Sequence, residues 1–315
     1  MSFVVNKDKV TSLVNKISKL VLIGDLNSPQ IEYFNSIDFS IVKSTSKFHT
    51  QKITNFKYLS NGLAASCSAD YTVYIFDPFT WVLIRKYLEH TNEVYCIDQI
   101  DADTLVSAAH DYTLRIWKIS SGQTLRKIEI PSITYVAKAL STGLIACGLI
   151  GTFEKNLLIY NFTSHAYYDP VKTLIGHNKT IYTIEILSDD LIASGGVDTK
   201  VIIWNLTTSK AKFSFVGHED KVFCVKKLSS NRAASADRSG IIFLWDWKTG
   251  SIFHKLTGHV ASLWKSLDLF DAETLISGSA DKTIKFWNIS SGELIQSINV
   301  DIQINALAML KKGSK

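Results

Sequence analysis

Histidine, serine and aspartate, the side chains of a hydrolytic triad, recur together along this chain of 315 residues. Three sets have closely similar spacing: His90, Ser107 and Asp111; His177, Ser194 and Asp198; His259, Ser277 and Asp281. A monomer seldom carries several copies of one active site, whereas structural hydrogen bonds recur wherever a structural unit recurs. We therefore interpret the three sets as structural, and we predict no catalytic residue and no enzymatic activity.

The stretch from Gly176 to His218 shows the repeated unit in its most regular form. It begins and ends on Gly-His, and the two histidines are 41 residues apart. The runs "TIYTIEIL", "LIASGG", "KVIIWNL" and "AKFSFVG" are rich in β-branched or aromatic residues and are separated by turn formers. No segment has a sustained apolar period of 3.6 residues. The unit is thus predicted to be a four-stranded sheet that needs copies of itself as neighbours.

Copies of this unit extend along nearly the whole chain. The loop histidine recurs at His49, His90, His177, His218 and His259, and an aromatic residue ends the third run at Phe34, Phe76, Trp117, Tyr160, Trp204, Trp245 and Trp287. One pattern joins these residues: Gly-His, a turn Asp about 21 residues later and then Trp-Asp or Trp-Asn. This pattern resembles the tryptophan-aspartate (WD) repeat. The resemblance implies an all-β fold: a seven-bladed β-propeller of four-stranded antiparallel blades.

The same resemblance implies a hydrogen-bonded chain inside each blade, from the turn Asp through His and Ser to the indole of the third strand. The implied tryptophans of the three complete sets are Trp117, Trp204 and Trp287. Unit two has Phe76, which offers no N–H, and we expect unit six to have Ser239 in place of the turn Asp.

We expect a single domain over residues 1–315. Its approximate units are 1–41, 42–82, 83–123, 124–167, 168–210, 211–251 and 252–293, followed by 294–315. In the first unit, "DKVTSLVNKI", "KLVLIGDL" and "QIEYFN" are predicted strands. Because open sheet edges favour aggregation, we expect either "INALAML" or "SFVVN" to close the ring. A truncated eighth blade is the alternative.

Composition excludes several classes of function. Lys and Arg exceed Asp and Glu by 34 to 29 without forming a cluster, which argues against a nucleic-acid binder. The cysteines form no CxxC pair and no unit has more than one loop histidine, so we predict no metal and no cofactor. No apolar run is long enough for a membrane helix and no signal peptide is recognised. We expect a cytoplasmic location, with the nucleus as the alternative.

The resemblance also implies where a partner binds, namely on one face of the disc near the channel. The favoured positions are the third and fifth residues after the loop His and the residue before the turn Asp. The fifth-position residues are Thr11, Thr54, Tyr95, Tyr135, Tyr182, Phe223 and Trp264. We expect the five consecutive aromatics to form an exposed ring that binds a partner; the alternative is that they fill gaps between blades. The other candidate contacts are Lys52, His110, Lys221 and Arg238.

The predicted function is therefore a non-catalytic scaffold or adaptor. It binds a protein or peptide on its rim, as a monomeric ring within a larger complex. The alternative is a reader of acidic or phosphorylated peptides, such as a substrate receptor in a ubiquitin-ligase complex, because Lys52, Lys221 and Arg238 add positive charge near the candidate surface.

Overall fold

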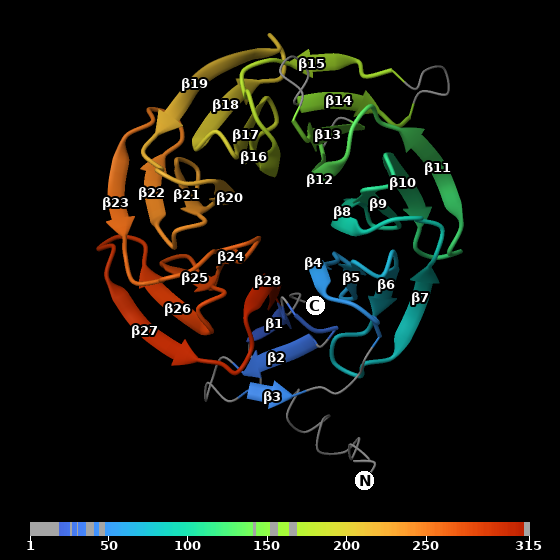
Figure 1. Ribbon diagram of the computed structural model, residues 1–315, viewed down its shortest axis with the longest axis horizontal. Coiled ribbons are helices and arrows are strands. Elements are labelled where there is room, and N and C mark those ends of the chain that lie inside the picture. Colours follow the sequence, from blue (N-terminus) through green and yellow to red (C-terminus); the bar gives the residue numbers. More distant parts are fainter. Residues whose placement is uncertain are drawn as a thin grey trace.

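The computed structural model describes residues 19–25, 27–29, 31–35, 41–43, 48–140, 143–151, 157–163 and 169–311. These residues form 28 β-strands, with no α-helix among them. The strands are grouped in four-stranded antiparallel sheets that surround a central channel, with one strand of each sheet nearest the axis (Figure 1). The prediction of an all-β propeller with four-stranded antiparallel blades is confirmed.

The sheets are named here by their order around the ring, with strands given from the channel outward. Six of them use four consecutive strands, and blade 1 combines the last strand with the first three. Blade 1 is β28 (Ile304–Lys311), β1 (Lys19–Asp25), β2 (Ile31–Asn35) and β3 (Ile41–Lys43); blade 2 is β4 (Ile53–Tyr58), β5 (Ala64–Ser68), β6 (Val73–Phe76) and β7 (Leu83–Tyr87); blade 3 is β8 (Val94–Asp101), β9 (Thr104–Ala109), β10 (Thr113–Lys118) and β11 (Thr124–Glu129); blade 4 is β12 (Thr134–Ala139), β13 (Leu144–Leu149), β14 (Leu157–Asn161) and β15 (Lys172–Leu174). Blade 5 is β16 (Ile181–Ser188), β17 (Leu191–Gly196), β18 (Lys200–Asn205) and β19 (Lys210–Val216); blade 6 is β20 (Val222–Lys227), β21 (Arg232–Asp237), β22 (Ile242–Asp246) and β23 (Ile252–Leu256); blade 7 is β24 (Leu267–Leu269), β25 (Thr274–Gly278), β26 (Thr283–Asn288) and β27 (Leu294–Asn299).

The second strand of each blade packs tightly against the next blade, and small residues make this packing fit. In β17, a Cβ atom added to Gly195 would lie 2.6 Å from Val222 Cγ1 of blade 6. Cβ atoms added to the corresponding Gly148 and Gly278 would lie 2.8 and 2.7 Å from the Cγ2 atoms of Ile181 and Ile304, the first residues of the following inner strands. Any larger residue at these three positions would force two blades apart.

Strand β28 closes the ring. It runs antiparallel to β1, with Leu22 opposite Ala308 and Gly24 opposite Ala306, so "INALAML" becomes the inner strand of blade 1 and does not begin another sheet. The sequence prediction placed "DKVTSLVNKI" at this inner position, where β28 is found instead. That segment and "SFVVN" lie outside the described residues.

The sequence units are offset from the blades by one strand. Unit 83–123 begins with β7, the outer strand of blade 2, and continues with the three inner strands of blade 3, β8 to β10. The boundary predicted between residues 41 and 42 falls inside β3, which belongs to blade 1. Each repeat therefore links two neighbouring sheets, so the fold of one blade depends on the next.

Candidate interaction surface at the channel mouth

Polar side chains inside the blades hold the loops of one face in place. In blade 3, His90 Nδ1 lies 2.8 Å from Asp111 Oδ2 and His90 Nε2 lies 2.7 Å from Ser107 Oγ, which in turn accepts the Trp117 indole N–H at 2.7 Å. Blades 5 and 7 repeat this chain with His177, Asp198, Ser194 and Trp204, and with His259, Asp281, Ser277 and Trp287. Asp111 also accepts the backbone N–H of Thr91 at 3.1 Å, which fixes the loop after His90.

Blade 6 differs from the prediction that Ser239 replaces the turn Asp. His218 Nδ1 bonds instead to Asp237 Oδ2 at 2.7 Å, and Ser239 Oγ donates to Asp237 Oδ1 at 2.7 Å. The carboxylate comes from the end of strand β21, two residues earlier in the chain, and still reaches the ring nitrogen. The Trp245 indole N–H of this blade is buried and has no hydrogen-bond partner among the described residues.

The environment of these groups supports a structural role. Burial acts to raise the pKa of Asp111, but hydrogen bonds from His90, Thr113 and the Thr91 backbone outweigh it and lower the pKa to about 2. Burial lowers the pKa of His90, since desolvation disfavours the imidazolium. Ser107 is only 1% exposed, so a substrate has no access to its hydroxyl. A buried serine of this kind is a hydrogen-bond relay and not a nucleophile.

The five candidate aromatics form one packed group at the channel mouth, here called the aromatic cluster: Tyr95, Tyr135, Tyr182, Phe223 and Trp264. Ring centroids of successive members lie 4.8, 5.0, 5.0 and 4.5 Å apart, and Trp264 of blade 7 also lies 5.8 Å from Tyr135 of blade 4. Phe223 is buried and the other four are half-buried, so the expected exposed ring is not found. The inner strands converge at the axis, and large side chains there meet one another across the mouth.

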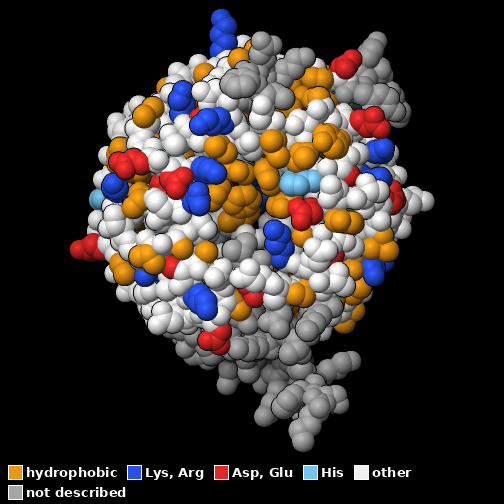
Figure 2. Space-filling view, in the orientation of Figure 1, with side chains coloured by type: hydrophobic (Ala, Val, Ile, Leu, Met, Phe, Trp, Pro, Cys, Tyr) orange, Lys and Arg blue, Asp and Glu red, His pale blue; other side chains and the backbone are white. Residues whose placement is uncertain are grey.

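Polar candidates surround the cluster on the same loops. The His110 ring stacks on the Tyr95 ring, with centroids 4.2 Å apart. His110 Nδ1 lies 3.7 Å from Glu93 Oε2, and the Tyr95 hydroxyl donates a hydrogen bond to the same oxygen at 2.7 Å. Burial lowers the pKa of His110 and raises that of Tyr95. Figure 2 shows hydrophobic side chains gathered around the centre of the face in view, with a histidine and charged side chains among them.

Lys221 and Arg238 lie side by side, because the Arg238 N–H donates to the Lys221 carbonyl at 2.9 Å. Arg238 is exposed, while Lys221 and Lys52 are half-buried. Two fifth-position residues lie apart from the cluster. Thr54 is buried and donates its hydroxyl to the Cys67 carbonyl at 3.1 Å, and Thr11 lies outside the described residues.

Sequence reasoning missed Lys265, which lies below the aromatic cluster. Its ammonium group donates to the backbone carbonyls of Tyr95 and, at 2.8 Å, of Tyr135, so it reaches from blade 7 to blades 3 and 4. One feature of the sequence could have indicated that the segment containing Lys265 is unusual. The distance in sequence from the loop His to the turn Asp is 22 residues in blade 7, between His259 and Asp281, but 21 in the other complete sets.

The wall of the channel carries a second group that the sequence analysis missed, here called the charge belt. One residue of each inner strand occupies the same level, in ring order from blade 2: Lys57, Asp98, Lys138, Glu185, Lys226, Asp268 and Ala308. The charges alternate, and ion pairs join Lys57 to Asp98 at 2.5 Å, Lys138 to Glu185 at 3.3 Å and Lys226 to Asp268 at 2.8 Å.

The carboxylates of the charge belt also reach forward to the next blade. Asp98 accepts the backbone N–H of Ala139 at 3.0 Å, Glu185 that of Lys227 at 3.2 Å and Asp268 that of Met309 at 3.0 Å. The remaining junction, between blades 1 and 2, is spanned by Asn305, whose amide donates to the Ile53 carbonyl at 2.8 Å. Every neighbouring pair of inner strands is thus connected by a side chain.

Two further classes of site are absent from the described part of the chain. It contains no group of three His, Cys, Asp or Glu side chains arranged as around a metal ion. It also has no helix with the length and apolar character needed to cross a membrane.

Four segments match the family model described as "WD domain, G-beta repeat": residues 81–118, 168–205, 209–246 and 250–288. The chain belongs to the WD-repeat β-propeller family. Each matched segment begins near the outer strand of one blade and ends in the third strand of the next, as the offset between repeats and blades requires.

Curated relatives of this WD-repeat chain are distant. Protein SUPPRESSOR OF PHYA-105 1 of Arabidopsis thaliana is 23% identical over 62% of this chain, and the match spans 19% of that protein. The Set1 complex component swd2 of Schizosaccharomyces pombe is 28% identical over 62% of this chain and 56% of its own length. The ribosome biogenesis protein WDR12 homolog of Drosophila sechellia is 29% identical over 39% of this chain and 29% of that protein.

Among solved structures, the computationally designed Ika8 protein has the same fold. It superimposes with a TM-score of 0.71, at 21% sequence identity, over 90% of this chain and 85% of the other. At this identity the likeness concerns the fold alone.

Proposed function

We propose that this WD-repeat chain is a seven-bladed, non-catalytic scaffold that binds a protein or peptide partner at the channel mouth. The observation that carries the proposal is the aromatic cluster, where half-buried rings from neighbouring blades lie beside His110, Lys221 and Arg238. Aromatic and arginine side chains are the types that contribute most to protein interfaces. The cytoplasmic or nuclear location stays a prediction.

The mechanism in this proposal is rigid display. The loops at the mouth are held by Asp111 and its counterparts in the other blades, so little conformational entropy is lost when a partner binds. Because the rings already pack against one another, a partner contacts their outer edges and does not insert between them. Two relatives are named for a complex or an assembly process, the Set1 complex and ribosome biogenesis, and this favours a role within a larger assembly.

A second candidate function is the recognition of acidic or phosphorylated peptides. The pairing of Lys221 with the exposed Arg238 favours it, since two cations on adjacent loops suit a phosphate or a pair of carboxylates. Glu93 on the opposite side of the mouth works against it by repelling an anion there.

Steric blocking of the mouth tests the proposed site whatever the chemistry of the partner. Thr180→Arg with Ser262→Arg puts two long charged side chains at third positions, on blades 5 and 7. A matched control, Ser230→Arg with Ala272→Arg, places the same change on exposed turns at the other end of the inner strands. Co-purification followed by mass spectrometry should show partners lost at least about tenfold from the blocked variant and retained by the control, with both melting temperatures close to wild type.

Retention of all partners by the blocked variant would overturn the proposed site. The two candidate functions are separated by Lys221→Glu with Arg238→Glu, compared with Arg126→Glu and Lys127→Glu on the outer strand β11. A reader of acidic peptides loses its partner only with the first pair. A partner that binds through the aromatic cluster is retained by both double variants.

A further inference from the structure

Blade 7 contains one residue more than its neighbours in the segment that enters the channel. The Ala280 N–H donates to the Ser262 carbonyl just as the Arg238 N–H donates to the Lys221 carbonyl in blade 6, and Leu267 lies opposite Ser277 as Val225 lies opposite Ser235. Five steps along the chain separate Ser262 from Leu267, whereas four separate Lys221 from Val225. The insertion is a bulge that delays the start of inner strand β24.

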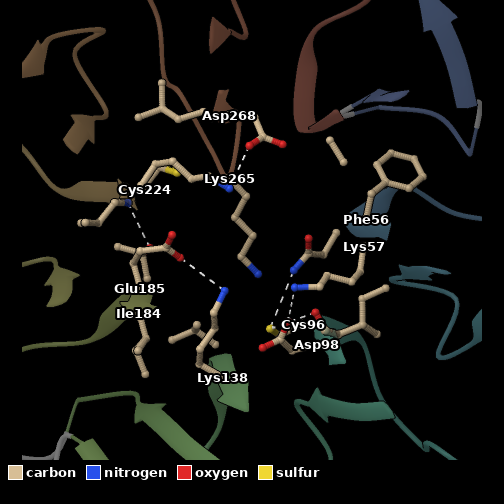
Figure 3. Close-up of a pocket in the computed structure, with 18 of the residues that line it drawn as sticks. Phe56, Lys57, Cys96, Asp98, Lys138, Ile184, Glu185, Cys224, Lys265 and Asp268 are labelled. Atoms are coloured by element: carbon tan, nitrogen blue, oxygen red, sulfur yellow. Dashed lines mark hydrogen bonds and ion pairs between the residues drawn. The ribbon is translucent and has the colours of Figure 1, made fainter. Parts of the chain in front are cut away.

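This bulge aims the Lys265 side chain into the channel. Lys265 has a φ of 42°, in the left-handed region that residues other than glycine rarely adopt. Figure 3 shows its side chain extending to the middle of the channel cavity. A bulge and an unusual backbone conformation together often mark a position selected for where it places a side chain.

The Lys265 ammonium group has no acidic partner in the described part of the chain. It donates two hydrogen bonds to backbone carbonyls, and no carboxylate of the described residues lies within ion-pair distance. Burial lowers its pKa, as expected for a cation that has lost water without gaining a counter-charge. One of its three N–H donors remains for a group inside the cavity.

The cavity itself is polar and measures about 340 Å³, at the small end of the range for ligand pockets. Its charged lining consists of the six ionised residues of the charge belt and Lys265. The belt balances three lysines against three carboxylates, so Lys265 leaves the lining with one excess positive charge. The aromatic cluster lies over Lys265, and the belt follows about three residues further along the inner strands, about 10 Å away.

We propose that the channel cavity binds a small oxyanion, with Lys265 as its principal ligand. A phosphate or a dicarboxylate of a few non-hydrogen atoms fits the volume and supplies the missing negative charge. The oxyanion accepts a hydrogen bond from the free N–H of Lys265. The belt lysines add a favourable electrostatic field, and each has N–H donors that its own ion pair does not use. The site lies on the channel side of the aromatic cluster, whereas the partner proposed above contacts the outer edges of its rings.

The test uses inorganic phosphate and malonate as probes, with sodium chloride at matched ionic strength as the reference. Isothermal titration and thermal unfolding are measured on the full chain, on Lys265→Met and on Lys212→Met, which removes an exposed lysine of outer strand β19. Wild type and Lys212→Met should bind one or both probes saturably and melt at higher temperature with them. Lys265→Met should bind at least about tenfold more weakly, as expected for the loss of a charged hydrogen bond.

The relative affinities of phosphate and malonate identify which oxyanion geometry the cavity prefers. Equal stabilisation of wild type and Lys265→Met would overturn the proposal, because the ions would then act at the surface; so would the lack of saturable binding to wild type. If Lys265→Met does not fold, amide NMR of wild type decides. Shifts at the lining residues Ile97, Ala137 and Ile184 upon phosphate addition support the site, and shifts confined to outer strands refute it.

Discussion

Two serines at the same position in different blades have different numbers of buried partners. Ser107 bonds to both His90 and the Trp117 indole, whereas Ser235 bonds to His218 and leaves the Trp245 indole without a partner. Leaving a buried polar group unsatisfied costs about 1–3 kcal/mol. The contribution of such a serine to stability therefore depends on its local network and not on its residue type alone.

We predict that Ser107→Ala lowers the free energy of unfolding by about 1–3 kcal/mol more than Ser235→Ala does, because it orphans two buried groups instead of one. Equilibrium denaturation in urea measures both values. Equal losses in the two variants would show that the indole hydrogen bond makes no net contribution.

The ionised form of Asp111 links the stability of blade 3 to pH. Its pKa is about 2 in the folded protein, below the ordinary value of 3.8, so the folded state binds this proton less tightly than the unfolded state. The resulting stabilisation is complete above about pH 4 and is lost as the pH falls through about 2. Asp111→Asn should therefore be less stable than wild type at neutral pH, with a difference that shrinks on acidification. Denaturation curves from pH 6 to 2 test this, and a constant difference would contradict it.

At the scale of elements, the ring depends on a strand from the far end of the chain. Ile304, Leu307 and Met309 of β28 pack with Val21 and Ile23 of β1 in one hydrophobic cluster. Without β28, the inner edge of β1 loses its hydrogen-bonding partner and this cluster is opened.

A chain ending at residue 303 should therefore lose its sharp thermal transition and tend to aggregate. Adding a synthetic peptide of residues 302–311 in excess should restore cooperative melting, because the strand can pair in trans. A scrambled peptide of the same composition is the control. Cooperative unfolding of the shortened chain without any peptide would show that closure by β28 is dispensable.

Strand positions could be predicted from the sequence because β-branched runs alternate with turn residues, as in residues 181–205. The sequence did not allow a prediction of which strand completes which sheet. Pairing of β28 with β1, or of β7 with β6, joins segments whose local patterns do not specify a partner. Asp237 was misassigned for a related reason: the reach of its carboxylate to His218 depends on side-chain geometry and not on a count of residues.

The position of the aromatic cluster could be predicted from the sequence, but the exposure of its side chains could not. Equal spacing after the loop His brought Tyr95, Tyr135 and Tyr182 to one mouth, but how far they are buried depends on the width of the ring at that level. The charge belt was missed because single charged residues about 41 positions apart, such as Lys57 and Asp98, look like solvated surface until the strands are arranged in a circle.

At the scale of the whole molecule, the charge belt acts as a network and not as isolated ion pairs. Lys138 lies between two carboxylates, and Asp98 and Glu185 both raise its pKa despite the opposing effect of burial. A cation flanked in this way inside a channel is screened less by salt than a surface pair.

We predict that Lys138→Met lowers the free energy of unfolding by about 1–3 kcal/mol, since it leaves two carboxylates without their shared cation. Lys127→Met, which breaks an exposed pair with Glu129, should cost less than about 0.5 kcal/mol. Urea denaturation at low and high salt provides both values. Similar effects of the two substitutions would show that the belt contributes no more than surface charge.

Ala308, the neutral position of the charge belt, reflects the odd number of inner strands in the ring. Two signs can alternate around a closed circle only if the number of charged places is even, and the belt has six charged places and one neutral one. Ala308 lies between Asp268 of blade 7 and Lys57 of blade 2, so a charge of either sign there would face one neighbour of its own kind. Adding or deleting one charged blade anywhere except beside Ala308 would place two like charges next to each other, which restricts where this ring could gain or lose a blade.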